Sequence, residues 1–181
     1  MSIPKQPPDV KLISSLFSSE AALIDTVISK MEVPFGQVDW VSEKQLFERT
    51  KYYAREMGWP LYRRFISFSK LIPPEAIVDI KLATNRIERE YVVDMRRRIN
   101  IDPGYISLER LILATGKNYT HRVYLAQGIY ADLTLVFHAG TFMPLTWTYP
   151  DYADEHVIAC FNMVRDGYLE HLRKEEKSNY A

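Results

Sequence analysis

The stretch His121-Arg-Val-Tyr-Leu-Ala-Gln-Gly-Ile-Tyr-Ala-Asp-Leu-Thr-Leu-Val-Phe137 predicts a β-hairpin, and the rest of the fold is inferred outward from it. Apolar and polar residues alternate on both sides of Ala126-Gln-Gly128, which is typical of two half-buried antiparallel strands. A three-residue loop with glycine in the left-handed position is a common way to close such a hairpin.

This loop length fixes which residues face each other. On an apolar face it pairs Leu125 with Ile129, Val123 with Ala131 and His121 with Leu133. On a polar face it pairs Tyr124 with Tyr130 and Arg122 with Asp132. A two-residue loop would instead put Asp132 against Val123, so the three-residue loop is preferred.

A second loop of the same kind is predicted at His138-Ala-Gly140. It leads into a strand over 141–147 and places Thr146 beside Asp132. The chain from Tyr105 onward is therefore expected to form an antiparallel meander with one core face and one polar face.

The first half of the chain alternates between strand and helix signals. The predicted elements are strands at 10–17, 37–41 and 61–68, and helices at 20–31 and from Pro73 to about 94–98. This strand–helix–strand–strand–helix order resembles the opening of a ferredoxin-like arrangement. A closing helix is predicted over 154–174, with Val157, Phe161, Val164, Tyr168 and Leu172 as its buried stripe.

The predicted fold class is α+β, with an antiparallel or mixed sheet. We expect a single domain over 10–176, a flexible tail at 1–9 and a second tail at 177–181, because 181 residues suit one well-cored domain.

Composition excludes several classes of function. The formal net charge is zero, whereas nucleic-acid binders usually carry a basic surplus, so nucleic acid is an unlikely partner. A single cysteine, Cys160, excludes an internal disulfide and a four-cysteine zinc site. Histidines and cysteines show no metal-ligand spacing, so no metal site is predicted. No apolar run reaches the roughly 20 residues of a membrane span, and the proline-rich N-terminus lacks a signal peptide's apolar core. A cytoplasmic protein is expected.

Four motifs, in this order, resemble those of a prokaryotic family, the domain-of-unknown-function family 4416. They are Asn100-Ile-Asp-Pro-Gly-Tyr105, Ala114-Thr-Gly-Lys-Asn-Tyr-Thr-His-Arg-Val-Tyr124, Gly128-Ile-Tyr-Ala-Asp132 and Trp147-Thr-Tyr-Pro-Asp-Tyr152. The resemblance covers nearly the whole chain and implies a single domain, but it brings no agreed reaction.

Some members of that family carry a "GTP-binding protein" label, which the residues here do not support. A P-loop requires Gly-x-x-x-x-Gly-Lys-Ser/Thr. Around Thr115-Gly-Lys-Asn118 only the Gly-Lys pair is present, with Leu111 at the first glycine position and Asn118 in place of the hydroxyl. Nucleotide binding by another geometry stays open.

The polar face of the meander is the predicted site for a small anionic ligand, such as a nucleotide or phosphoester. His121, Asp132 and Asp102 are the candidate catalytic residues, since histidine titrates near neutrality and carboxylates accept protons. The candidate ligand-binding residues are Asn100, Tyr105, Lys117, Arg122, Tyr124, Tyr130 and Trp147. The sequence specifies no cofactor and no reaction.

Each candidate also has a structural interpretation. Asp102-Pro-Gly104 is first of all a turn, and Arg96-Arg-Arg98 is more often a solvated helix end than an anion site. His121 on the apolar side is equally well a core histidine, and Arg122 opposite Asp132 is equally well a cross-strand ion pair. The alternative function is a non-catalytic protein-interaction module, or a homodimer, that uses the same aromatic face.

Overall fold

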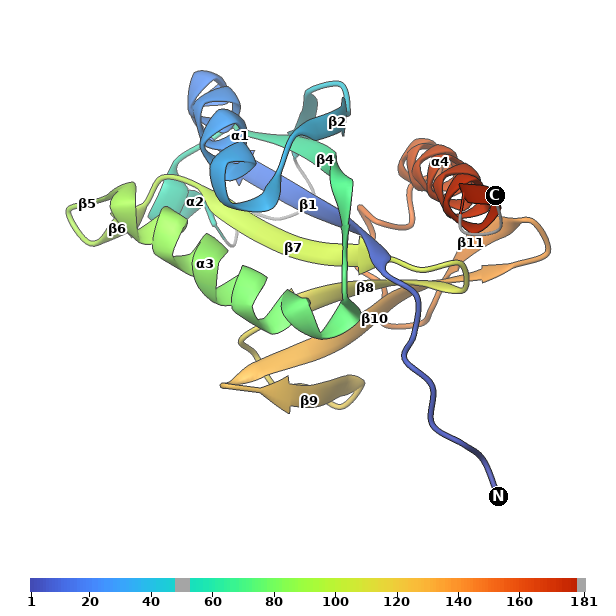
Figure 1. Ribbon diagram of the computed structural model, residues 1–181. Helices are drawn as coiled ribbons and strands as arrows, with labels where there is room; N and C mark the ends of the chain where they lie inside the picture. The colour runs from blue at the N-terminus through green and yellow to red at the C-terminus, as the bar shows by residue number, and fades with distance from the viewer. Residues whose placement is uncertain (48–52, 179–181) are drawn as a thin grey trace.

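The computed structural model describes residues 1–47 and 53–178. Within these residues one antiparallel sheet holds nine strands in the order β11-β10-β8-β7-β1-β4-β2, with β3 paired to β4 and β9 paired to β10. The strands are β1 (Val10–Ser18), β2 (Val38–Val41), β3 (Gln45–Phe47), β4 (Leu61–Ile72), β7 (Asn100–Ile106), β8 (Arg110–Thr115), β9 (Arg122–Ala126), β10 (Ile129–His138) and β11 (Thr141–Pro144). The predicted α+β class is confirmed (Figure 1).

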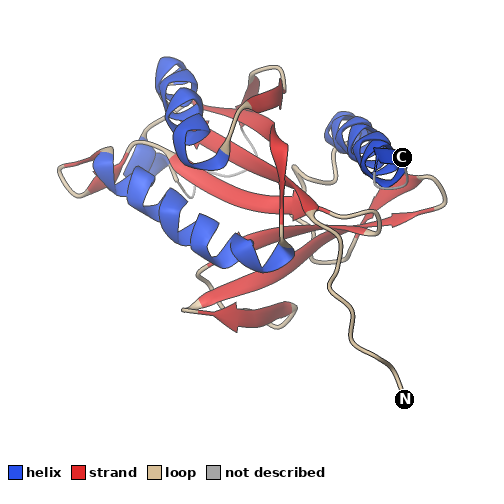
Figure 2. Cartoon of the chain, in the orientation of Figure 1, coloured by secondary structure: helices blue, strands red, loops and turns tan. Residues whose placement is uncertain are grey.

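Helices cover both faces of the sheet. The described helices are α1 (Ala21–Phe35), α2 (Ala54–Met57), α3 (Ile77–Glu90), which follows a 3-10 turn at Pro74–Ala76, and α4 (Glu155–Ser178). Helices α1 and α3 share one buried cluster with the sheet, and α4 packs into another on the opposite face. Figure 2 shows α4 apart from α1 and α3 across the strands. No helix of the described chain is long and apolar enough to cross a membrane.

In the first half, β4 lies between β1 and β2 and is antiparallel to both. Strands β1 and β2 therefore run parallel, and α1 connects them. The predicted strands at 10–17, 37–41 and 61–68 are confirmed as β1, β2 and β4. The short elements β3 and α2 interrupt the expected order before β4, and the ferredoxin-like comparison stays a prediction.

Three predicted helix ends are wrong. Helix α1 continues past the predicted end at residue 31 to Phe35, with Pro34 inside it. Helix α3 ends at Glu90, not at 94–98, because the chain turns into a small hairpin of β5 (Val92–Val93) and β6 (Arg96–Arg97). Asp94 and Met95 form that turn with φ of 49° and 61°. Helix α4 runs through Lys177 and Ser178, which were expected to lie in a tail, and residues 179–181 lie outside the described chain.

Asp102-Pro-Gly104, interpreted above as a turn, is instead part of the interior strand β7. Asp102 pairs with Ser15 of β1, and Gly104 pairs with Leu113 of β8. A Cβ atom on Gly104 would lie 2.3 Å from the Ile112 carbonyl oxygen. The glycine therefore permits a close approach of two strands and makes no turn.

Both hairpin loops are one residue shorter than predicted. Gln127-Gly128 and Ala139-Gly140 form two-residue turns, with all four residues at positive φ. In the first hairpin, Ile129 pairs with Ala126 instead of Leu125, and an irregularity before Tyr130 restores the predicted Tyr124–Tyr130, Val123–Ala131 and Arg122–Asp132 pairs. The bulge shifts the register by one residue, so the two-residue turn still leads to the predicted polar pairs.

The second turn changes where Thr146 lies. His138 pairs with Thr141, and β11 ends at Pro144, so Thr146 does not pair beside Asp132. The predicted apolar core face of the first hairpin is also wrong at its outer strand, because Val123 and Leu125 of β9 are exposed. Within residues 1–47 and 53–178, strand β9 pairs only with β10, and it projects beyond the helices that cover the sheet.

We expect Gly104→Ala to lower the free energy of unfolding by at least about 2 kcal/mol, because the added methyl group would overlap a backbone carbonyl in the sheet. Gly116→Ala is the matched control. Its added Cβ meets no atom within 4 Å, so its effect should stay within about 0.5 kcal/mol. Urea denaturation of both variants measures the difference, and equal effects would contradict the close-approach explanation.

Candidate functional site

The sheet face that α4 covers is apolar at one end and polar at the other. Ile13, Phe65, Leu111 and Leu135 form the apolar part, together with α4 residues. At the other end Ser15 pairs with Asp102, and Gly104, Leu113, Asp132 and Arg122 follow one another across neighbouring strands. Alternation places the side chains of Ser15, Asn100, Asp102, Asp132 and Arg122 on this one face. We call these five residues the polar end.

A buried ion pair between Arg122 and Asp132 lies at the centre of one half of the polar end. Their side chains are 8% and 5% exposed, and Arg122 Nε donates to Asp132 Oδ2 at 2.8 Å. The other guanidinium nitrogens donate at 2.9 Å to the Lys117 carbonyl and to the Tyr149 hydroxyl. Arg122 therefore links the loop before β9 and the loop after β11 to Asp132 of β10.

His121 lies on the same side as Asp132, so its predicted place on the apolar face is wrong. It precedes β9 in a turn, where strand alternation does not apply, and its Nε2 lies 3.4 Å from Asp132 Oδ2. The imidazole stacks on Trp147 with ring centres 5.2 Å apart and an angle of 12°. Tyr119 meets it edge-on at 5.4 Å.

Side chains of the loop after β11 bind the backbone of β10 where neither β9 nor β11 pairs with it. The Trp147 indole donates to the Leu133 carbonyl at 2.8 Å, and the Thr148 hydroxyl donates to the Thr134 carbonyl at 2.5 Å. These bonds hold Trp147 and Tyr149 beside His121 and Arg122.

The other half of the polar end is an ionic network around Asn100 and Asp102. Arg97 makes a two-nitrogen contact with Glu56, at 2.6 and 2.9 Å, and donates to Asn100 Oδ1 at 2.8 Å. The Asn100 amide donates in turn to Asp102 Oδ2 at 2.7 Å. From helix α3, Lys81 Nζ lies 3.5 Å from Asp102 Oδ1.

Helix α3 also completes the hydrogen bonds of β7. The Lys81 ammonium donates to the Ile101 carbonyl, and the Ile101 N–H donates to Glu88. Strand β8 pairs only with residues 104–106 of β7, so these side chains replace a neighbouring strand. At Ile101 the edge of β7 is therefore hydrogen-bonded by α3 side chains and not by β8.

Electrostatic effects connect the two halves. The pKa of Glu56 lies below its usual value, mainly because of its Arg97 hydrogen bond, and Lys117 lowers it further. Burial raises the pKa of Tyr53 to about 12, and Asp102 and Tyr149 act on it in the same direction. Burial also raises the pKa of Glu88.

The structure brings most of the predicted site residues together. One half contains His121, Asp132, Arg122 and Lys117, with Trp147 stacked on the histidine. The other half contains Asn100 and Asp102. Tyr124 and Tyr130 pack edge-on at 5.3 Å on the same side. Tyr105 is the exception, because it lies on the opposite face against the α1–α3 cluster.

Sequence reasoning missed Glu56 and Tyr149 as site residues. It also did not single out the buried Arg63, although Arg63 alternates with Phe65 and Ser67 in β4, which puts a charge on a core face. Nothing in the spacing of Glu56 pointed to its contact with Arg97. Arg97 and Arg98 themselves are paired with acids, Glu56 and Glu20, and are not a solvated helix end.

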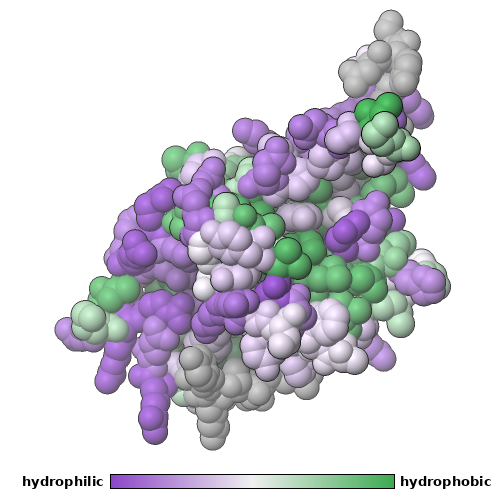
Figure 3. All heavy atoms as spheres, turned by 90° about the horizontal axis from the view of Figure 1, so that it is seen from below, coloured by the Kyte–Doolittle hydropathy of each residue, from purple (hydrophilic) through white to green (hydrophobic). Residues whose placement is uncertain are grey.

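The rim of the His121 half carries exposed aromatic side chains. Tyr119, Tyr149 and Trp147 are 64%, 49% and 41% exposed. Figure 3, the view from below, shows hydrophobic and hydrophilic side chains intermixed on that face of the molecule. Within the described chain, no three His, Cys, Asp or Glu side chains are grouped as metal ligands.

Comparison with known proteins gives one result. A family model described as a domain of unknown function (DUF4416) matches residues 8–168, in agreement with the resemblance of the four motifs. Searches of curated proteins and of solved structures returned no significant match.

We expect Arg122→Ala to destabilise the fold by roughly 3–5 kcal/mol, because it leaves the Asp132 carboxylate buried and unpaired. Arg110→Ala is the control, since Arg110 and its partner Glu109 are more than half exposed and their pair contributes little. Thermal and urea unfolding of both variants test this. If Arg122→Ala lowers the free energy of unfolding by less than about 1 kcal/mol, the pair contributes little to the stability of the fold.

The raised pKa of Glu88 gives a pH-dependent prediction. A carboxyl whose folded pKa exceeds its unfolded value favours folding below the unfolded pKa, and this contribution is lost as pH rises through the folded pKa. Glu88→Gln should therefore be more stable than the natural protein at pH 7, and the difference should shrink toward pH 4. Melting temperatures across this range check the sign. A difference that grows on acidification would contradict it.

Proposed function

The chain belongs to the DUF4416 family, and we propose that it binds a small anionic ligand, of the nucleotide or phosphoester class, at the polar end of its sheet. The observation that carries this proposal is the exposed aromatic rim, Tyr119, Trp147 and Tyr149, beside His121 and Lys117. Aromatic faces stack on planar bases, and a lysine ammonium pairs with phosphate.

The residues have different roles in this proposal. Trp147 and Tyr119 would contact a planar ring, and Lys117 would pair with the anionic group. Arg122 acts as a positioning residue, because all three of its nitrogens already bind Asp132, Lys117 and Tyr149. It holds the rim in place without needing to touch the ligand.

Proton transfer would involve His121 with Asp132 in one half and Asp102 in the other. His121 Nε2 lies 3.4 Å from Asp132, an arrangement that orients an imidazole for acid–base work. Asp102 is 35% exposed at its side chain and is held by Asn100 and Lys81, so one carboxylate is open to a ligand.

A second candidate function is association with a protein partner or a second copy. The observation in its favour is the exposure of Val123, Tyr124 and Leu125, at 67%, 58% and 39%, on strand β9. Neighbouring exposed apolar side chains on an edge strand are typical of interaction surfaces.

Ligand binding can be tested by tryptophan fluorescence with a panel of ATP, GTP, AMP and inorganic phosphate. Nucleotides should quench Trp147 saturably, and Trp147→Phe should remove the change although Trp40 and Trp59 remain. Lys117→Ala should weaken binding about tenfold through loss of a charge-assisted contact. Lys174→Ala, an exposed lysine near the end of α4, is the charge-matched control and should not affect it.

If no compound of the panel changes either the fluorescence or the melting temperature, the ligand proposal fails. Light scattering then tests the second candidate. A dimer that Val123→Glu dissociates would support it, whereas a monomer over the whole concentration range would count against self-association.

A further inference from the structure

The β5–β6 hairpin is a two-stranded sheet of its own, and it projects from one end of the molecule, at the left of Figure 1. Its turn residue Met95 is 93% exposed, and Val93 and Val92 are 50% and 38% exposed. Figure 3 shows hydrophobic side chains that protrude at the same left end, next to hydrophilic ones. These apolar side chains contribute little to the core, so packing within the fold does not explain them.

Methionine is an unfavourable residue for the turn of this hairpin. Asp94 and Met95 have φ of 49° and 61°, and turns with two residues at positive φ favour Gly, Asn and Asp. Asp94 fits this preference, whereas a long side chain is strained there. The chain therefore carries a large apolar side chain where the backbone favours glycine and where solvent surrounds it. Such an outlier points to a role for the side chain outside the fold.

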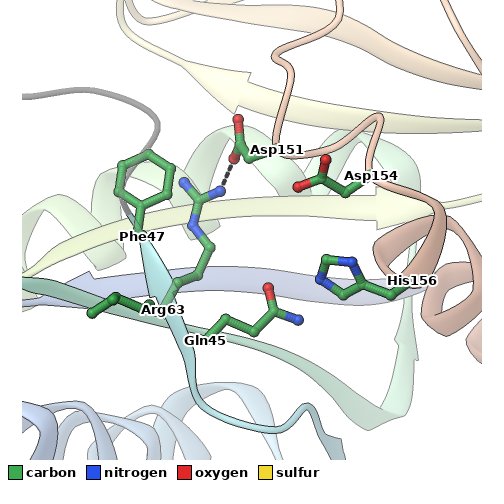
Figure 4. Close-up of a pocket in the computed structure, with 7 residues that line it drawn as sticks. Gln45, Phe47, Arg63, Asp151, Asp154 and His156 are labelled. Carbon is green, nitrogen blue, oxygen red and sulfur yellow. Dashed lines mark ion pairs between the residues drawn. The ribbon is translucent and has the colours of Figure 1, made fainter.

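Most arginines of the described chain face carboxylates. Arg63 faces Asp151, as Figure 4 shows, and Arg97 of β6 faces Glu56. The described arginines that have no carboxylate within ion-pair distance are Arg55, Arg86, Arg89, Arg96 and Arg173, all of them exposed. Apart from Arg173, near the end of α4, they lie in α2, in the second half of α3 or in β6, and α2 contacts β6. The unpaired arginines thus gather around the hairpin.

The helix dipole accounts for part of this charge, since Arg86 and Arg89 lie near the C-terminal end of α3. It does not account for Arg96, which pairs with Val93 across the hairpin, so that an unpaired guanidinium and an exposed valine are cross-strand neighbours. Asp94 opposes these arginines with one carboxylate. The hairpin end therefore combines exposed apolar side chains with a surplus of positive charge.

We propose that this hairpin docks on an anionic membrane surface. Met95 and Val93 enter the boundary between headgroups and acyl chains, while Arg96 and Arg89 pair with lipid phosphates. Apolar side chains at that boundary and basic side chains beside anionic headgroups both strengthen such peripheral binding. A second copy of the chain would bring the same arginines and would not complement this charge. Nucleic acid would pair with the arginines but would leave the apolar tip in water.

The experiment is co-sedimentation of the full chain with vesicles of phosphatidylcholine alone and of an equal mixture of phosphatidylcholine and phosphatidylglycerol. Binding to the mixed vesicles should saturate with lipid and weaken as sodium chloride is added, because salt screens the arginines. Absence of binding to the mixed vesicles, or equal binding to both compositions, overturns the proposal. Binding to duplex DNA without binding to vesicles also overturns it and assigns the arginines to nucleic acid.

Met95→Gly separates docking from folding. Glycine relieves the positive φ, so the melting temperature should stay unchanged or rise, while binding to the mixed vesicles should fall at least about tenfold because the apolar side chain is lost. Met163→Ala is the matched control, since it removes an exposed methionine from α4 and should leave vesicle binding unchanged. Full vesicle binding by Met95→Gly contradicts the proposal.

The two charges beside Met95 should act in opposite directions. Arg96→Ala should weaken binding to the mixed vesicles about fivefold, and Asp94→Asn should strengthen it about fivefold, because asparagine tolerates the positive φ and removes the opposing charge. Arg110→Ala, at an exposed arginine of β8, is the control and should have no effect on vesicle binding. If Asp94→Asn and Arg96→Ala both leave vesicle binding unchanged, the hairpin is not the docking surface.

Discussion

The burial of Arg122 beside Asp132 is the interaction on which the candidate site depends. Two opposite charges at 8% and 5% exposure are tolerated only if further hydrogen bonds satisfy the remaining donors. Here those bonds come from the Lys117 carbonyl and the Tyr149 hydroxyl, so satisfying the guanidinium also fixes the loops before β9 and after β11. The hydrogen bonds that satisfy the buried Arg122–Asp132 pair of β9 and β10 thus also position the aromatic rim.

Much of the fold could be predicted from sequence patterns, because α3 and α4 each bury one regular face, and β1 is buried on both faces along its whole length. The pairing of Arg122 with Asp132 was also predictable, since opposite charges and matching tyrosines both indicated it. The turn at Gln127-Gly128 was not, because a bulge compensates for the shorter loop and leaves the polar pairs unchanged. Local spacing cannot distinguish a longer loop from a shorter loop with a bulge.

The features that sequence reasoning missed have a common cause. Asp102-Pro-Gly104 has the composition of a turn, and only the position of Ile112, in another strand, explains why glycine is needed there. His121 was assigned by alternation, which stops where the chain turns before β9. Arg63 and Tyr152 meet only after β4 and the loop before α4 are packed together. These contacts are long-range, and a sequence pattern contains no information on them.

The attachment of Trp147 and Thr148 to β10 also covers the part of this strand's edge that β9 and β11 leave unpaired. A strand edge with unpaired carbonyls can recruit an identical strand from another molecule and start aggregation. Two side chains occupy the carbonyls of Leu133 and Thr134, and Pro144 at the end of β11 has no N–H to offer an incoming strand. The loop that presents the aromatic rim to solvent is thus also the cover that keeps this edge of the sheet from growing.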